Sequence, residues 1–163
     1  MSRWYSGDIE GKFWFGIQSS HAADRFGVNV CKFVRLDERF DCWQEFKTLD
    51  DAYNVPGDGI VMLRYSFLTD DLTRVQGELD SMIANLHTML GNDKYQKYGI
   101  DSIRTCHQDN EAFNVKTDII WNLSHIDKLP INIVAELADF ALGCSIENSI
   151  LNTTACNFYA DLE

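Results

Sequence analysis

The chain has 163 residues, of which 45% are hydrophobic and 24% charged, a composition typical of a globular protein. Its 25 acidic and 14 basic residues give a formal net charge of −11. This balance argues against direct binding to nucleic acid or to an anionic membrane, since both contacts need clustered Lys and Arg.

The N-terminal residues 4–18 predict a β-hairpin. Residues 12–18 are rich in aromatic side chains and alternate with period two, as strands do, and residues 7–11 supply the turn. One face of the second strand carries Phe13, Phe15 and Ile17, and the other carries Lys12, Trp14, Gly16 and Gln18. We expect residues 19–27 to form a polar loop after this strand.

The middle of the chain predicts further strands at residues 28–36 and 60–68. Between them, residues 37–53 fit either a helix or a short strand followed by a turn or a helical turn, and we favour the second interpretation. Pro56 and Gly57 mark a break before the strand at 60–68.

A long amphipathic helix is predicted next, at residues 70–90. Thr69 is expected to cap it, and Asp70 and Asp71 occupy the first turn, where the helix dipole favours acids. Gly91 is suited to end this helix. Its apolar stripe consists of Leu72, Val75, Leu79, Met82, Leu86 and Leu90.

The last third of the chain predicts a second long helix, from Pro130 to about residue 152, because Pro is favoured in the first turn. Shorter helices are predicted at residues 93–98 and 117–125, whereas residues 99–116 give no assignment. Residues 156–162 alternate again and predict a closing strand.

The order of strands, helices and one final strand predicts a single α+β domain over residues 1–163. We expect an antiparallel sheet formed by the N-terminal hairpin, the middle strands and the C-terminal strand, with the two long helices packed on one face. The closing strand should pair with the N-terminal hairpin, since its backbone groups would otherwise lack partners. Phe158 and Ala160 then face the helices, and Asn157, Tyr159 and Asp161 face away.

The five cysteines form no C-x-x-C pair, and the chain has neither a long apolar segment nor an apolar signal sequence. We therefore expect reduced thiols and a cytoplasmic location. The sequence lacks the phosphate-binding loop, the dinucleotide fingerprint, the zinc-protease motif and the nucleophile elbow. We therefore assign no catalytic residue, cofactor or metal ligand.

Candidate binding residues lie in two places. Residues 19–25 bring hydroxyl, imidazole, carboxylate and guanidinium groups together, and we expect them to form an exposed loop at an edge of the sheet. A purely structural turn, with Arg25 paired to one of the many acids, is the alternative. The sheet face away from the helices is the second place, unless residues 28–68 cover it. The assigned residues are Lys12, Trp14, Gln18, Ser19, Ser20, His21, Asp24, Arg25 and Tyr159.

Four stretches carry a resemblance: YSGDIEGKFWF at 5–15, QSS at 18–20, YSF with TDDL at 65–72, and CNFYADL at 156–162. They resemble stretches of small uncharacterised proteins of marine bacteriophages and phage-like elements. Residues 28–55 are longer than this pattern, which suggests an inserted hairpin. The resemblance implies a protein made in a phage-infected bacterium, and no functional residue follows from it.

Small accessory phage proteins often bind and inactivate a host component, so the resemblance implies a binding protein, with a host protein as the favoured partner. A second version sequesters a nucleotide immune signal, with Lys12, Arg25 and Arg64 holding phosphate. Two further alternatives are a small hydrolase that uses Ser20, His21 and Asp24, and an acidic mimic of nucleic acid. The sequence leaves a homo-oligomer open.

Overall fold

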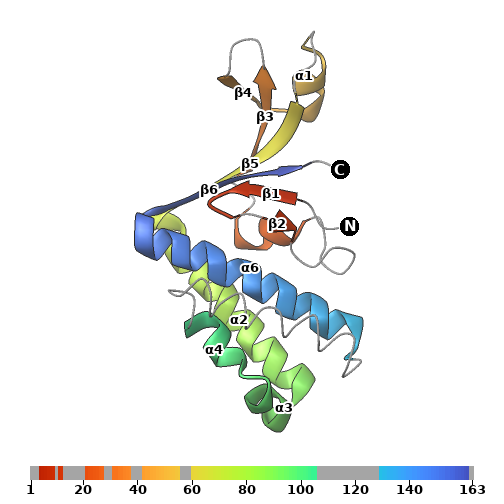
Figure 1. Cartoon of the computed structure of the whole chain (residues 1–163), viewed down its shortest axis with the longest axis vertical. Coiled ribbons are helices and arrows are strands. Elements are labelled where there is room, and N and C mark those ends of the chain that lie inside the picture. Colours follow the sequence, from red (N-terminus) through yellow and green to blue (C-terminus); the bar gives the residue numbers. More distant parts are fainter. Residues whose placement is uncertain are drawn as a thin grey trace.

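A computed structural model describes residues 4–9, 11–12, 21–27, 31–37, 42–55, 60–105 and 129–161. In these residues a six-stranded antiparallel sheet lies beside a layer of helices (Figure 1). The strand order is β2-β1-β6-β5-β3-β4. The strands are β1 (Trp4–Gly7), β2 (Gly11–Lys12), β3 (Cys31–Asp37), β4 (Cys42–Phe46), β5 (Ile60–Leu68) and β6 (Ala155–Asp161).

The two long helices, α2 (Leu72–Leu90) and α6 (Ile131–Thr153), pack together on one face of the sheet (Figure 1). The predicted α+β fold is confirmed, including the pairing of the C-terminal strand β6 with the N-terminal strand β1. The shorter helical elements are η1 (Ala22–Phe26), α1 (Leu49–Tyr53), η3 (Thr69–Asp71), α3 (Asn92–Lys97) and α4 (Ile100–Thr105).

Residues 37–53 contain the strand and helical turn that we favoured. β4 pairs with β3 as a hairpin at one edge of the sheet, and α1 follows it. Thr48 caps α1, because its hydroxyl accepts a hydrogen bond from the Asp51 N–H at 3.2 Å. The helix predicted at 117–125 and the strand residues 13–18 lie outside the described residues.

Alternation along β5 divides the sheet into two faces. Leu63, Tyr65 and Phe67 are buried against the helices. On β6, Phe158 stacks on Tyr65 with ring centroids 5.0 Å apart and contacts Tyr5 edge to face at 5.3 Å. The opposite face, which we call the outer face, carries Ser6, Glu45, Arg64, Ser66, Asn157 and Tyr159.

The predicted apolar stripe of α2 forms much of the core, with Val75, Leu79, Met82 and Leu86 fully buried. α6 is buried along most of its length, which accounts for its mainly apolar sequence. Even its Glu147 is buried, and Arg104 of α4 pairs with this carboxylate through two hydrogen bonds of 3.1 and 2.8 Å.

The expected cap at Thr69 is wrong. Residues Thr69–Asp71 form a separate 3-10 turn, and the carboxylate of Asp71 accepts the Leu68 N–H at 2.8 Å. The Thr69 hydroxyl instead donates to the carbonyl of Thr154, which lies where α6 meets β6. The Thr69 hydroxyl thus bonds a carbonyl far away in the sequence, in place of the local N-cap hydrogen bond that we expected. The end at Gly91 is confirmed, with φ of 78° and its N–H bonded to the carbonyl of His87.

Candidate functional site

The predicted binding loop contains the η1 turn, which lies between the sheet and the long helices (Figure 1). Phe26 is fully buried, and its ring lies so close to Gly143 of α6 that a Cβ there would be 2.4 Å from it. Ala22 and Ala23 are also buried. Arg74 of α2 donates from Nε to the carbonyl of Phe26 at 2.9 Å, which fixes the end of the turn.

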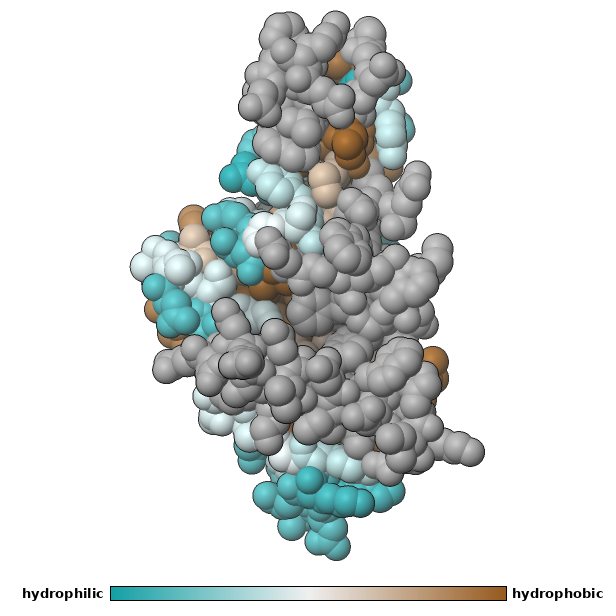
Figure 2. All heavy atoms as spheres, in the orientation of Figure 1, coloured by the Kyte–Doolittle hydropathy of each residue, from teal (hydrophilic) through white to brown (hydrophobic). Residues whose placement is uncertain are grey.

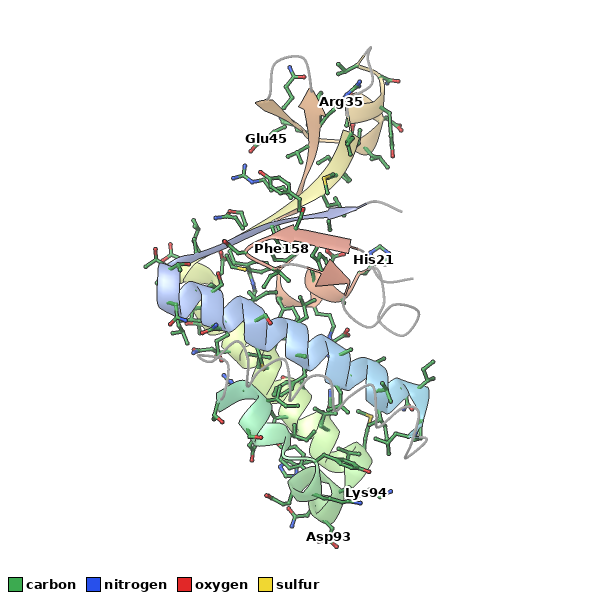
Figure 3. The ribbon with its side chains drawn as sticks, viewed as in Figure 1. His21, Arg35, Glu45, Asp93, Lys94 and Phe158 are labelled. Atoms are coloured by element: carbon green, nitrogen blue, oxygen red, sulfur yellow. The ribbon has the colours of Figure 1, made fainter. Side chains whose placement is uncertain are left out.

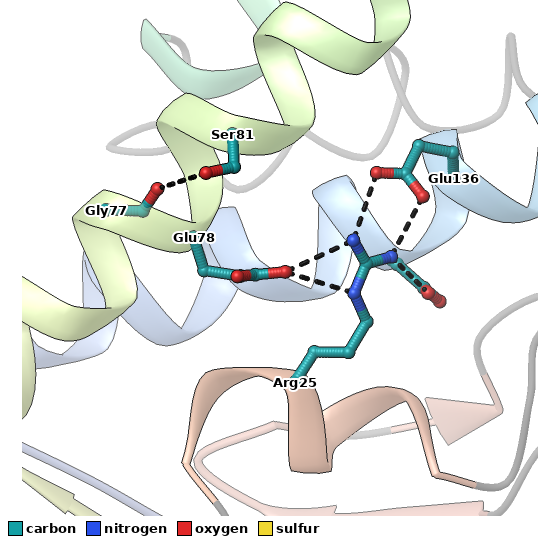
Figure 4. A network of polar contacts seen from close by, with 6 residues as sticks. Arg25, Gly77, Glu78, Ser81 and Glu136 are labelled. Atoms are coloured by element: carbon teal, nitrogen blue, oxygen red, sulfur yellow. Dashed lines mark hydrogen bonds and ion pairs between the residues drawn. The ribbon is translucent and has the colours of Figure 1, made fainter.

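Arg25 reaches from η1 into a group of three carboxylates (Figure 4). Its Nη1 donates to Glu136 and to Asp139 of α6, both at 2.9 Å, and its Nε donates to Glu78 of α2 at 3.2 Å. Burial alone would lower the pKa of Arg25, but the hydrogen bonds to Glu136 and Asp139 outweigh it and raise this pKa above its ordinary value. Arg25 thus ties η1 to both long helices. We call Arg25, Glu78, Glu136 and Asp139 the Arg25 cluster.

His21 and Asp24 form a second polar group at the start of the same turn. His21 Nδ1 lies 3.3 Å from Asp24 Oδ2, and the hydroxyl of the buried Tyr65 donates to Asp24 Oδ1 at 2.6 Å. The side chain of His21 is 72% exposed. A histidine oriented by a carboxylate is the arrangement that acid–base catalysis uses.

The expectation of an exposed loop is therefore wrong for most of this segment. Of the described residues 21–25, only His21 is exposed. One side of the η1 turn is apolar and consists of Ala22, Ala23 and Phe26. The prediction of an exposed loop rested only on the polar residues beside them. Packing of this apolar side directs Arg25 inward, toward the helices, so the structural alternative describes its contacts better. The binding role predicted for Arg25 would require three carboxylates to release it.

The outer face presents a different set of groups. The strand register places Lys32, Arg64, Tyr159 and Ser6 opposite one another on the adjacent strands β3, β5, β6 and β1. Arg64 Nη1 donates to Glu45 Oε1 of β4 at 2.8 Å, with side chains 36% and 47% exposed. Because β3 lies between β5 and β4, this ion pair passes over β3, where Val34 is fully buried.

Side chains beside this row are also polar. Ser66 donates from its hydroxyl to Asn157 Oδ1 at 2.6 Å, and the Asn157 N–H donates to the carboxylate of Asp8 at 2.7 Å. The outer face thus combines an arginine, a tyrosine and several hydrogen-bonding groups on adjacent strands.

The sheet separates the predicted site residues into two groups. Asp24 and Arg25 contact Tyr65 and the long helices on the helix side. Tyr159 lies on the outer face, where the register with Trp4 also places Lys12. Trp14, Gln18, Ser19 and Ser20 lie outside the described residues, so their roles stay predictions.

Sequence reasoning missed the partners of the two arginines. Glu136 and Asp139 stand three residues apart on a helix that is otherwise mainly apolar. Acids on the buried face of a helix need a cationic partner. These two acids in a mainly apolar sequence were therefore the available sign that a Lys or Arg from elsewhere in the chain packs against the helix. Glu45 gave no such sign, because it lies in a stretch with several other acidic residues.

Among the residues that the structure describes, no group of three or more His, Cys, Asp or Glu side chains could hold a metal ion. No helix in the described ranges is long and apolar enough to cross a bilayer. A comparison of the chain with protein-family models, with curated proteins and with solved structures gives no match.

Proposed function

We propose that this chain is an accessory protein of phage origin that binds and inactivates a host protein, and that its binding surface is the outer face. The observation that carries this proposal is the direct cross-strand pairing of Arg64 with Tyr159 on that face. Arginine and tyrosine are among the residues that are enriched at the centres of protein–protein interfaces. The adjacent Ser66 and Asn157 can exchange hydrogen bonds with a partner at the rim.

The helix side supports this choice of surface. Arg25, Asp24 and Phe26 are engaged in holding η1 against the helices and β5. Their side chains therefore contribute to stability, whereas the partly exposed Arg64 and Tyr159 are accessible to a second molecule.

The experiment compares four variants in capture of host proteins. Purified chain is immobilised and exposed to bacterial lysate, and the captured protein is identified and its affinity measured with purified components. We expect Arg64→Ala and Tyr159→Ala to weaken binding at least about tenfold, as interface centres do. Lys94→Ala and Tyr53→Ala are matched controls. Both side chains are exposed. Lys94 lies on α3, at the far end of the molecule from Glu45 (Figure 3). Tyr53 lies at the end of α1.

Equal affinities of Arg64→Ala, Tyr159→Ala and the controls would contradict the assignment of the outer face. Nucleotide released from the denatured protein, without any captured protein, would favour the nucleotide alternative over protein capture.

The pairing of His21 with Asp24 favours a small hydrolase as a second candidate function, because a carboxylate that orients an exposed imidazole is the arrangement that acid–base catalysis uses. The test is ester hydrolysis by the wild type and by His21→Ala. Turnover above that of free imidazole, lost in His21→Ala while the melting temperature is unchanged, would support it. Equal rates in the two proteins would exclude it.

A further inference from the structure

The arginines that the structure describes differ in how fully their guanidinium groups are engaged. Arg25 binds three carboxylates, and Arg104 binds Glu147 twice and Asp80 once. Arg35 donates to the carbonyls of Ala52 and Val55, and Arg74 to Phe26 and Asp71. Arg64 has one partner among the described residues, the single oxygen of Glu45.

Arg64 therefore has unused capacity for hydrogen bonds. A guanidinium has five N–H donors in a planar fork that matches the oxygens of carboxylate or phosphate. Arg64 Nε is buried, and no described residue accepts a hydrogen bond from it. A group with two or more oxygens at this position would engage the Nη donors that Glu45 leaves unused.

The ion pair between Arg64 and Glu45 is also easily exchanged. Both side chains are partly exposed, and exposed ion pairs of this kind contribute little to stability. Glu45 lies on β4, the edge strand of the sheet, whereas Arg64 lies on β5, two strands away. Release of the carboxylate would thus require movement of a side chain at the edge and no change in the strand pairing.

A second cationic residue is placed beside Arg64. The register pairs Lys32 of β3 directly with Arg64, in a chain that is strongly acidic as a whole. Two positive residues in adjacent register positions suit a doubly charged phosphate better than a single carboxylate. Tyr159 occupies the register position on the other side of Arg64.

We propose that Arg64 is an anion-binding group of the outer face, and that a phosphate group of the bound ligand takes the place of the Glu45 carboxylate on it. Glu45 keeps the guanidinium oriented until the ligand binds. This inference rests on the proposed function only in taking the outer face as the binding surface, and it adds the chemical group that this face recognises.

The test uses inorganic phosphate as the probe and the NMR signal of the Arg64 Nε–H as the readout. The wild type, Glu45→Gln, Arg64→Gln and the control Lys94→Gln are titrated at constant ionic strength, with acetate as the competing anion. We expect Glu45→Gln to bind phosphate at least about threefold more tightly than the wild type, since it removes the competing carboxylate. Lys94→Gln should match the wild type, and acetate should bind more weakly than phosphate.

Three results would overturn the inference: no Arg64 signal change with phosphate in Glu45→Gln, tighter binding of acetate than of phosphate, or unchanged phosphate binding in Arg64→Gln as followed by backbone signals. Circular dichroism and melting temperature establish that each variant is folded.

A parallel titration with AMP identifies the source of the phosphate: tighter binding than inorganic phosphate assigns the site to a nucleotide, and equal binding assigns it to the phosphate group alone. Because phosphate is used without any partner protein, failure here leaves the capture experiment intact, and failure of the capture experiment leaves this result intact.

Discussion

The Arg25 cluster and the pair of Arg64 with Glu45 use the same chemistry on opposite sides of one sheet. Arg25 is surrounded by three carboxylates from two helices, and two of these, Glu136 and Asp139, are largely buried. Arg64 meets one carboxylate that is about half exposed. The number of partners and their burial, and not the residue type, therefore distinguish an arginine that stabilises the fold from one that is accessible to a ligand.

The largest loss of stability is expected for Arg25→Ala. The substitution leaves Glu136 and Asp139 largely buried without their cation, and we expect it to cost about 3 kcal/mol in free energy of unfolding. Urea denaturation measures this cost. A loss no larger than that of an exposed ion pair would show that the cluster is not a structural tie. Arg25→Lys is the control that keeps the charge and loses the planar fork.

Gly143→Ala tests the packing that directs Arg25 inward. The added Cβ would lie 2.4 Å from the Phe26 ring and 2.7 Å from Leu79, so the η1 turn must shift. We expect a cost of about 1–3 kcal/mol, typical of an overpacked core. Thermal denaturation measures it. Gly77→Ala is the matched control, because a Cβ at Gly77 meets nothing within 4 Å, and it should not destabilise α2. Equal melting temperatures of the two variants would contradict the close packing of η1.

The thiol of Cys156 gives a prediction for alkaline pH. Burial on the helix side of the sheet raises its pKa from 9.0 to about 12. The unfolded chain therefore loses this proton first, and stability falls as the pH rises above about 9, by about 1 kcal/mol at pH 10. The pH slope of unfolding between 9 and 10 should be smaller in Cys156→Ala. Identical slopes would show that the thiol ionises equally in both states.

The smallest effect on stability is expected for Arg64→Ala. Its ion pair is exposed, so the free energy of unfolding should change by about 0–1 kcal/mol. Chemical denaturation of Arg64→Ala and Arg25→Ala under the same conditions compares the two losses in free energy of unfolding directly. A loss as large as that of Arg25→Ala would place both arginines in the same structural class and remove the basis for treating Arg64 as a ligand-binding group.

Much of the fold was predictable because it depends on local patterns. The alternation of Leu63, Tyr65 and Phe67 gave the strand β5, and the stripe from Val75 to Leu86 gave α2. The prediction that Thr69 caps the helix was wrong, because its hydroxyl donates to the carbonyl of a residue 85 positions away and no local pattern encodes that contact.

The candidate site was harder to predict for the same reason. His21 and Asp24 are three positions apart, and their proximity was readable from the sequence. Arg25 meets Glu136 and Asp139 across 111 and 114 positions, and Arg64 meets Glu45 only because β3 brings β5 and β4 into one sheet. Such contacts follow from the tertiary arrangement and not from composition or spacing.

The position of β6 has a consequence for how the protein is made. β6 lies between β1 and β5 in the sheet, yet it is the last described strand in the chain. Until residues 155–161 are synthesised, the other described strands form two separate parts, one containing β1 and β2 and the other β5, β3 and β4. The two parts join only when β6 inserts between them, so these six strands form one sheet only after residues 155–161 have left the ribosome.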